Sequence, residues 1–174
     1  MNVYIGLDIS TSKIGMALIA EDQTLVETKL IKFKSSQSLE SRTMDFAMHL
    51  TTFLGANHKA LDVFVEEPAN IFAMGRSSAH TISKLQRFNG MCSYAIAIGL
   101  GMSAKLIGVR HARSSVGLKI KRGDNTKLEV IKWVKAKYPK DFLFEMTRHG
   151  NPKPGTDDIA DAIVVALAGI NSKE

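Results

Sequence analysis

Cysteine is almost absent from this chain of 174 residues, since Cys92 is the only one. A single thiol excludes an internal disulfide framework and a cysteine-rich zinc site, and it is typical of a reducing compartment. The longest run without a polar side chain, residues 94–102, is far shorter than the roughly 18–20 residues that span a bilayer. Because no basic-then-apolar leader opens the sequence either, we expect no membrane span, no secretion and a cytoplasmic location.

Acidic residues are the scarcer charged type, with 17 Asp+Glu against 23 Lys+Arg, a net charge of +6 and a pI of about 9.5. The basic surplus is local: residues 105–153 hold 13 basic and 4 acidic residues, whereas the rest of the chain holds 10 and 13. Such a surplus favours a polyanionic partner. The composition is otherwise that of a globular protein without low-complexity segments, and no repeat or linker divides it, so we predict one domain over residues 1–174.

The hydrophobic pattern predicts alternating strands and helices. Period-two alternation and short turns indicate an antiparallel meander of three strands at residues 2–8, 14–20 and 24–34. Further along, strands are expected at residues 61–66 and 104–109. Helices are expected after caps at Ser38, Ser77 or Ser78, Asn125 and Thr156. This order predicts an α/β fold with a five-stranded mixed sheet and helices on both faces.

Acidic residues stand at unusual places in this pattern. Asp8 ends the first strand, Glu66 ends the fourth, and Asp158 and Asp161 lie on one face at the start of an otherwise apolar last helix. Each acid alone has a simpler role, as a turn former, a strand exit or a helix cap. Buried carboxylates, however, need a cation, and oxygen ligands without His or Cys favour Mg²⁺ or Mn²⁺. Together with the basic segment, they favour a nuclease with two such ions.

Three segments carry a resemblance to a known family. IGLDIS…GMALI, VFVEEPANIFAMGR and DDIADAIVVAL resemble the motifs of RuvC-type Holliday-junction resolvases of the RNase H-like superfamily. The resemblance implies an RNase H-like fold and a homodimer that binds branched DNA. It also implies metal-dependent paired nicking of symmetric strands in four-way junctions, leaving 5′ phosphates. Asp8, Glu66, Asp158 and Asp161 would be the catalytic metal ligands, with Asp157 as the alternate to Asp158, and each site would hold two Mg²⁺ or Mn²⁺ ions.

The same resemblance assigns roles to basic and aromatic residues. Lys127 would be catalytic and Arg113 would approach the scissile or neighbouring phosphates. Phe72 falls near the position of an aromatic residue that probes bases at the junction centre, with core packing as the alternative. His149, shortly before the acidic helix, is a candidate metal-site residue or an incidental loop histidine. Further DNA contacts are expected, against the alternative of a solvated surface, from Arg76, Lys84, Arg87, Lys119, Lys121 and Arg122.

Other functions share parts of this pattern. The segment LDISTSKIGMAL also resembles the phosphate-binding hairpin of actin-like ATPases and sugar kinases. Those enzymes need a second lobe and a second, Gly-rich phosphate loop, and 174 residues contain neither, so we expect no nucleotide cofactor. An RNase H-like nuclease acting on RNA–DNA hybrids or on flap or other branched DNA stays open, because the carboxylates do not discriminate among these substrates. A module that binds branched DNA without cutting it would not need every acidic position.

Overall fold

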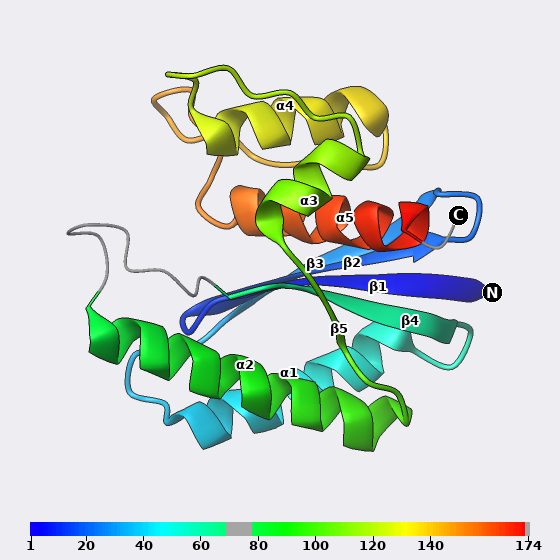
Figure 1. The fold of residues 1–174 in the computed structure, drawn as a ribbon, viewed down its shortest axis with the longest axis vertical. Coiled ribbons are helices and arrows are strands. Elements are labelled where there is room, and N and C mark those ends of the chain that lie inside the picture. Colours follow the sequence, from blue (N-terminus) through cyan, green and yellow to red (C-terminus); the bar gives the residue numbers. More distant parts are fainter. Residues whose placement is uncertain (69–77, 173–174) are drawn as a thin grey trace.

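The sheet has the strand order β3-β2-β1-β4-β5 in the computed structural model, which describes residues 1–68 and 78–172 (Figure 1). β1 pairs antiparallel with β2 and β2 with β3, whereas β4 is parallel to β1 and β5 is parallel to β4. The predicted five-stranded mixed sheet is therefore confirmed. Its strands are β1 (Asn2–Ile9), β2 (Lys13–Ala20), β3 (Leu25–Lys32), β4 (Lys59–Glu66) and β5 (Lys105–Ile107).

Helices cover both faces of this sheet, as predicted. In Figure 1, α1 and α2 lie on one face, and α5 lies on the other with α3 and α4 stacked beyond it. In the described part of the chain, none of these helices has the length and apolarity that crossing a membrane requires. They are α1 (Leu39–Leu54), α2 (Ala79–Leu100), α3 (Val109–Ser115), α4 (Thr126–Lys137) and α5 (Thr156–Asn171).

The central strand β1 contributes to two separate cores, because successive side chains of a strand point to opposite faces. Val3, Ile5 and Leu7 are fully buried against the side of α1 and α2. The alternate positions, which include Gly6 and Asp8, face α5. Asp8 is therefore directed into the layer between the sheet and α5.

Two glycines allow α5 to lie unusually close to the sheet. A Cβ atom on Gly6 would stand 2.1 Å from the carbonyl oxygen of Ala162, and one on Gly15 would stand 2.1 Å from the carbonyl oxygen of Asp158. Neither position can carry a side chain without moving backbone. The apolar helix is buried along most of its length, and its first turn rests on β2.

Most of the predicted helix starts are confirmed. Ser38, Ser78 and Asn125 cap α1, α2 and α4, and each side chain accepts a hydrogen bond from a backbone N–H of the first turn. The predicted cap at Thr156 is wrong. Gly155 is the N-cap, with φ of 104°, a conformation that favours glycine, and Thr156 is the first helical residue.

The segment after α2 also differs from the prediction. β5 is limited to Lys105–Ile107 instead of residues 104–109, and Val109 already belongs to α3, a helix that the apolar pattern did not indicate. The reason is local: the extended Gly108 ends the strand, and its carbonyl accepts the first helical hydrogen bond, from Ala112 N at 2.8 Å. α3 places the start of the basic segment beside α5.

Candidate active site

Two strand carboxylates lie at one end of the sheet. β1 and β4 are parallel neighbours, with Leu7 beside Val65, so Asp8 and Glu66 follow at the same edge. The side chain of Asp8 also faces Gly15 across the β1–β2 pair. Because Gly15 lacks a side chain, the first turn of α5 reaches this edge.

The first two turns of α5 bring three further carboxylates to the same place. Asp158 is only 6% exposed, and the side chains of Asp157 and Asp161 are 15% and 18% exposed. Asp157 Oδ1 also accepts a hydrogen bond of 3.3 Å from the backbone N–H of Gly155, so it helps to cap the helix. The predicted convergence of acidic residues from β1, β4 and α5 is therefore present.

The crowded carboxylates resist ionisation. Burial, reinforced by the charges of Glu66, Asp161 and Asp158, raises the pKa of Asp8 well above its usual value. Burial and the neighbouring Asp161 raise the pKa of Glu66 to about 7. Burial raises the pKa of Asp161 to about 6, although the charge of Arg113 opposes the shift. Ionised together, these carboxylates would therefore carry more negative charge than the nearby cations of the protein balance.

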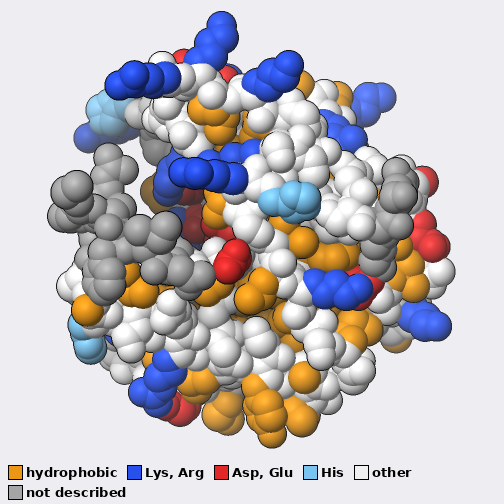
Figure 2. All heavy atoms as spheres, viewed as in Figure 1, with side chains coloured by type: hydrophobic (Ala, Val, Ile, Leu, Met, Phe, Trp, Pro, Cys, Tyr) orange, Lys and Arg blue, Asp and Glu red, His pale blue; other side chains and the backbone are white. Residues whose placement is uncertain are grey.

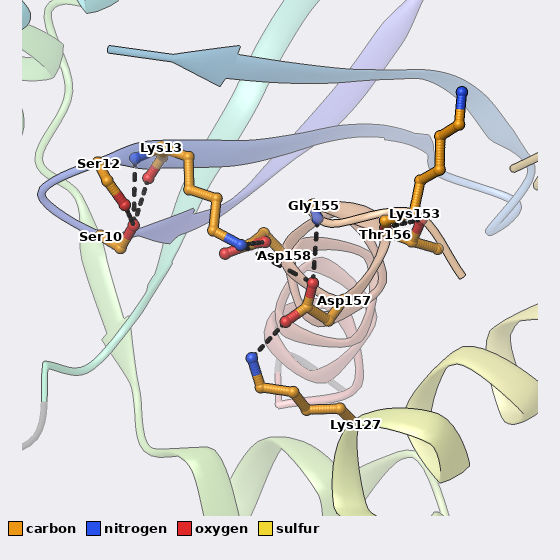
Figure 3. A network of polar contacts seen from close by, with 9 residues as sticks. All are labelled: Ser10, Ser12, Lys13, Lys127, Lys153, Gly155, Thr156, Asp157 and Asp158. Atoms are coloured by element: carbon orange, nitrogen blue, oxygen red, sulfur yellow. Dashed lines mark hydrogen bonds and ion pairs between the residues drawn. The ribbon is translucent and has the colours of Figure 1, made fainter. Parts of the chain in front are cut away.

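Two lysines pair with the acidic residues at the start of α5 (Figure 3). Lys13 Nζ donates a hydrogen bond to Asp158 Oδ2 and lies 3.8 Å from Asp157 Oδ1, and Lys127 Nζ donates to Asp157 Oδ2. Burial disfavours ionisation of Asp157, but the two lysines outweigh it and lower the pKa of Asp157 to about 2. For Asp158, burial outweighs the hydrogen bond from Lys13 and raises the pKa.

Arg113 is the third basic residue at the site. Its Nη2 lies 3.9 Å from Asp161 Oδ1, and its charge opposes the rise in the pKa of Glu66. The side chain of Arg113 is 27% exposed and that of Lys127 is 70% exposed. Arg113 and Lys127, to which the resemblance assigns contacts with the scissile or neighbouring phosphates, thus lie beside the carboxylates and reach solvent.

The donor set fits a hard divalent cation in its chemistry. It consists of carboxylate oxygens alone, and their mutual repulsion is the kind of charge excess that Mg²⁺ or Mn²⁺ neutralises. Within residues 1–68 and 78–172, no three His, Cys, Asp or Glu side chains are already grouped around a common point for a metal ion. At Asp158, an ammonium group holds the carboxylate instead.

The other predicted DNA-contact residues within the described part of the chain lie on two exposed areas. Lys84 and Arg87 line a groove between the starts of α1 and α2, where Arg87 Nη2 lies 2.5 Å from Glu40 Oε1. Lys119, Lys121 and Arg122 are exposed between α3 and α4. Figure 2 shows acidic side chains inside a hollow on one face, with Lys and Arg side chains along the upper side of the hollow and beyond it.

A second groove adjoins the carboxylates directly. It runs between the start of α4 and the loop before α5, and its walls include Lys127, Leu128, Pro152, Lys153 and Asp157. Polar and apolar side chains both line this groove, and Asp157 is the member of the acidic cluster that lines it.

The remaining candidates are Phe72, Arg76 and His149. Phe72 and Arg76 lie outside the described residues. His149 is exposed, and one of its ring nitrogens accepts a hydrogen bond of 3.0 Å from Arg148 Nε.

Lys13 and Arg42 are two basic residues near the site that were not predicted from the sequence. The signal for Lys13 was its position five residues after Asp8, the one charged residue in a turn of small hydroxyl residues. Arg42 is buried in α1 and donates hydrogen bonds to the carbonyls of Thr11, Lys34 and Ser35. It therefore joins the β1–β2 turn to the segment that precedes α1.

The fold, a five-stranded mixed sheet with helices on both faces, is similar to that of solved Holliday-junction resolvases. RuvC of Thermus thermophilus, in complex with a Holliday-junction substrate, superposes with a TM-score of 0.69 at 18% identity, covering 99% of this chain and 96% of that chain. The yeast mitochondrial Holliday junction resolvase Ydc2 gives 0.59 at 12% identity, over 97% and 77%.

The resolvase of Fowlpox virus, in complex with Holliday-junction DNA, gives a TM-score of 0.54 at 16% identity, over 98% of both chains. No protein-family model matches the sequence, and no curated protein matches it. The expected resemblance to RuvC-type resolvases is confirmed in the fold over nearly the whole chain.

Proposed function

We propose that this protein is a structure-selective endonuclease that resolves four-way DNA junctions. The observation that carries the proposal is the convergence of Asp8, Glu66, Asp158 and Asp161 at one edge of the sheet, with pKa values raised by burial and mutual repulsion. Uncompensated buried charge destabilises a fold, and ionisable groups with strongly shifted pKa values cluster at catalytic sites. The fold shared with junction resolvases supports DNA junctions as the substrate.

The proposed cofactor is Mg²⁺ or Mn²⁺, with two ions per site. Asp8, Glu66, Asp158 and Asp161 would hold them, and Asp157 is the alternate ligand. Asp157 is already neutralised by Lys127 and caps the helix, and it affects the pKa of Asp8 less than Asp158 does. When bound, such ions activate water for in-line attack on a phosphodiester and stabilise the leaving 3′ oxygen, which leaves a 5′ phosphate.

The cations of the protein itself would bind and orient the DNA. Lys127 and Arg113 stand at the border between the carboxylates and solvent, where they can contact the scissile and neighbouring phosphates. Residues farther out would hold the junction arms through phosphate contacts, which position DNA without reading its sequence. These residues are Lys84, Arg87, Lys119, Lys121 and Arg122.

A homodimer is part of the proposal, because two symmetric nicks require two active sites related by a two-fold axis. Large apolar side chains stand exposed at helical spacing on α1, at Met44 and Met48, and on α2, at Tyr94 and Ile98. They are 63–70% exposed, and a second copy of the chain would bury them. Replacing Ile98 with Glu should turn a dimer into a monomer in sedimentation equilibrium.

The deciding experiment compares Asp161→Asn with the unchanged protein on a synthetic four-way junction with Mg²⁺ or Mn²⁺. We expect loss of paired nicking with retained junction binding, because the substitution removes a ligand charge and leaves the basic surface intact. Asp22→Asn, at an exposed turn, is the matched control. Undiminished cleavage by Asp161→Asn would refute the assignment of the site. In a panel of junction, flap, duplex and RNA–DNA hybrid, nicking confined to flaps or to RNA strands would favour the alternative nuclease.

A further inference from the structure

The ammonium group of Lys13 contacts a carboxylate that is one of the proposed metal ligands. It opens β2, on the face that also carries Gly15, and its side chain extends to the first turn of α5 (Figure 3). Its ammonium donates a hydrogen bond to Asp158 Oδ2 and lies 3.8 Å from Asp157 Oδ1. One cation thus bridges two acidic residues that lie 145 and 144 positions away in the sequence.

The backbone of Lys13 is fixed, whereas its side chain can leave. The carbonyl of Lys13 accepts hydrogen bonds from Ser10 N at 3.0 Å and Ser10 Oγ at 2.8 Å, and its N–H donates to Ser10 Oγ at 3.2 Å. Arg42 holds the same turn through the carbonyl of Thr11. The Lys13 side chain, however, is 26% exposed and has four rotatable bonds, so the ammonium has a path to solvent.

We propose that Lys13 acts as a tethered cation that neutralises Asp158 in the metal-free protein and competes with a divalent ion for that carboxylate. This inference rests on the proposed metal site. The lone pair of Asp158 Oδ2 that accepts the ammonium hydrogen bond cannot coordinate a metal ion at the same time, and the charge of Lys13 repels a cation at the other carboxylate oxygen. Full coordination by Asp158 therefore requires Lys13 to withdraw. Lys13 is then a positioning residue that weakens metal affinity and stabilises the protein between metal-binding events.

The two lysines at α5 have different parts in this arrangement. Lys127 is 70% exposed and pairs with Asp157, the acidic residue that already caps the helix. Lys13 pairs with Asp158, whose side chain is 9% exposed and which repels Asp8. Competition with a metal ion is therefore expected from Lys13 first.

Mn²⁺ binding to the full-length protein, measured by isothermal titration calorimetry without DNA, tests the inference. Lys13→Met should bind Mn²⁺ about tenfold more tightly than the unchanged protein. Lys13→Arg, which keeps the charge, should stay close to the unchanged protein. Lys32→Met is the matched control, because Lys32 pairs with Lys13 in the β2–β3 register but is exposed, and it should leave Mn²⁺ affinity unchanged.

Thermal unfolding gives a second readout. The salt dependence of Mn²⁺ affinity then separates direct contact between Lys13 and Asp158 from repulsion of the metal ion at a distance. Lys13→Met should lower the Tm of the protein in EDTA and leave the Tm in saturating Mn²⁺ unchanged. The gain in affinity should also persist in about 1 M salt, where the Debye length is about 3 Å and distant charges are screened. Lys13→Gln is the second neutral variant, with folding checked by circular dichroism.

The outcomes distinguish this inference from the proposed function. Equal Mn²⁺ affinity in the unchanged protein and both neutral variants would overturn the role of Lys13 and leave the metal site standing. A gain that disappears in 1 M salt would also overturn it, since it would reflect only repulsion at a distance. No Mn²⁺ binding by any of the proteins would overturn both proposals.

Discussion

Asp8 and Gly15 lie directly opposite each other across the β1–β2 pair, and the backbone of Asp158 rests on Gly15. The strand position that faces the central carboxylate is therefore the one that has no side chain. Since a Cβ there would meet the carbonyl of Asp158 at 2.1 Å, the approach of α5 to Asp8 depends on this glycine. The geometry of the site is set by packing as much as by its charged residues.

Gly15→Ala tests this dependence. The added methyl group has backbone in its way, so the first turn of α5 must move outward, and we expect the free energy of unfolding to fall by about 1–3 kcal/mol. Junction cleavage should fall by more than about tenfold, because displacements of about 1 Å are costly in catalysis. Urea unfolding and single-turnover nicking would measure the two effects.

Gly99→Ala is the control for this experiment. Gly99 lies in α2, where an added Cβ meets nothing within 4 Å, and alanine favours a helix by up to about 1 kcal/mol. We expect unchanged or slightly higher stability and normal cleavage. Loss of cleavage in Gly99→Ala equal to that in Gly15→Ala would contradict the packing argument.

Arg42 is expected to support the site from the opposite face of the sheet. It is 6% exposed, and its guanidinium donates to three backbone carbonyls that join the β1–β2 turn to the segment before α1. Arg42→Leu leaves these carbonyls without their donor, so stability should fall by at least about 2 kcal/mol. Arg42→Lys should restore little of this stability, because an ammonium group cannot reproduce the planar set of donors of a guanidinium. Chemical denaturation would measure both variants.

An exposed arginine provides the comparison. Arg87 forms an ion pair with Glu40 at the surface, and Arg87→Leu should cost less than about 1 kcal/mol. If Arg42→Leu were as mild as Arg87→Leu, the hydrogen bonds of Arg42 would not be important for the turn.

Sequence patterns predicted the parts of the fold that have a regular period. Alternation placed Asp8 and Glu66 at strand ends, and helical spacing put Asp158 and Asp161 on one face, because these depend only on neighbours in the chain. The cap of α5 at Gly155 rather than Thr156 was not predicted, because the left-handed backbone of Gly155 depends on how the preceding loop meets the sheet. The short α3 had too few residues to show a period.

Contacts between distant segments were beyond the sequence pattern. The position of Lys13 shortly after Asp8 does not reveal that it meets α5, and nothing in the spacing of Arg42 reveals that it supports the β1–β2 turn. From the sequence alone, Lys13 resembles an exposed residue of a turn and Arg42 an exposed residue of a helix. The site therefore includes cations that only the packing of the sheet against α1 and α5 reveals.

The stability of the metal-free protein should fall as pH rises from about 5 to 7. The pKa of Glu66 is about 7 in the fold against an ordinary value of 4.5, so between these values the folded state binds more protons than the unfolded state. Deprotonation then opposes folding, and the raised pKa of Asp8 acts in the same direction. Glu66→Gln should make this slope shallower in urea unfolding with EDTA.

The control for the pH dependence is Glu27→Gln, on the exposed side of β3, which should retain the slope of the unchanged protein. Stability that rises between pH 5 and 7, or an identical slope in Glu66→Gln, would contradict the assignment of Glu66 to a crowded acidic site.

The salt dependence of junction binding should reveal the contacts of Arg113 and Lys127. Each phosphate contact contributes about −0.9 to the slope of log affinity against log salt on duplex DNA, so Arg113→Met with Lys127→Met should make the slope shallower by about 1.8. Binding would be measured by fluorescence anisotropy in EDTA, which prevents cleavage. Lys59→Met, at the exposed start of β4 and the opposite end of the sheet, should leave the slope unchanged. An unchanged slope in the double variant would mean that DNA does not reach these two cations, and the path of the scissile strand over the carboxylates would have to be redrawn.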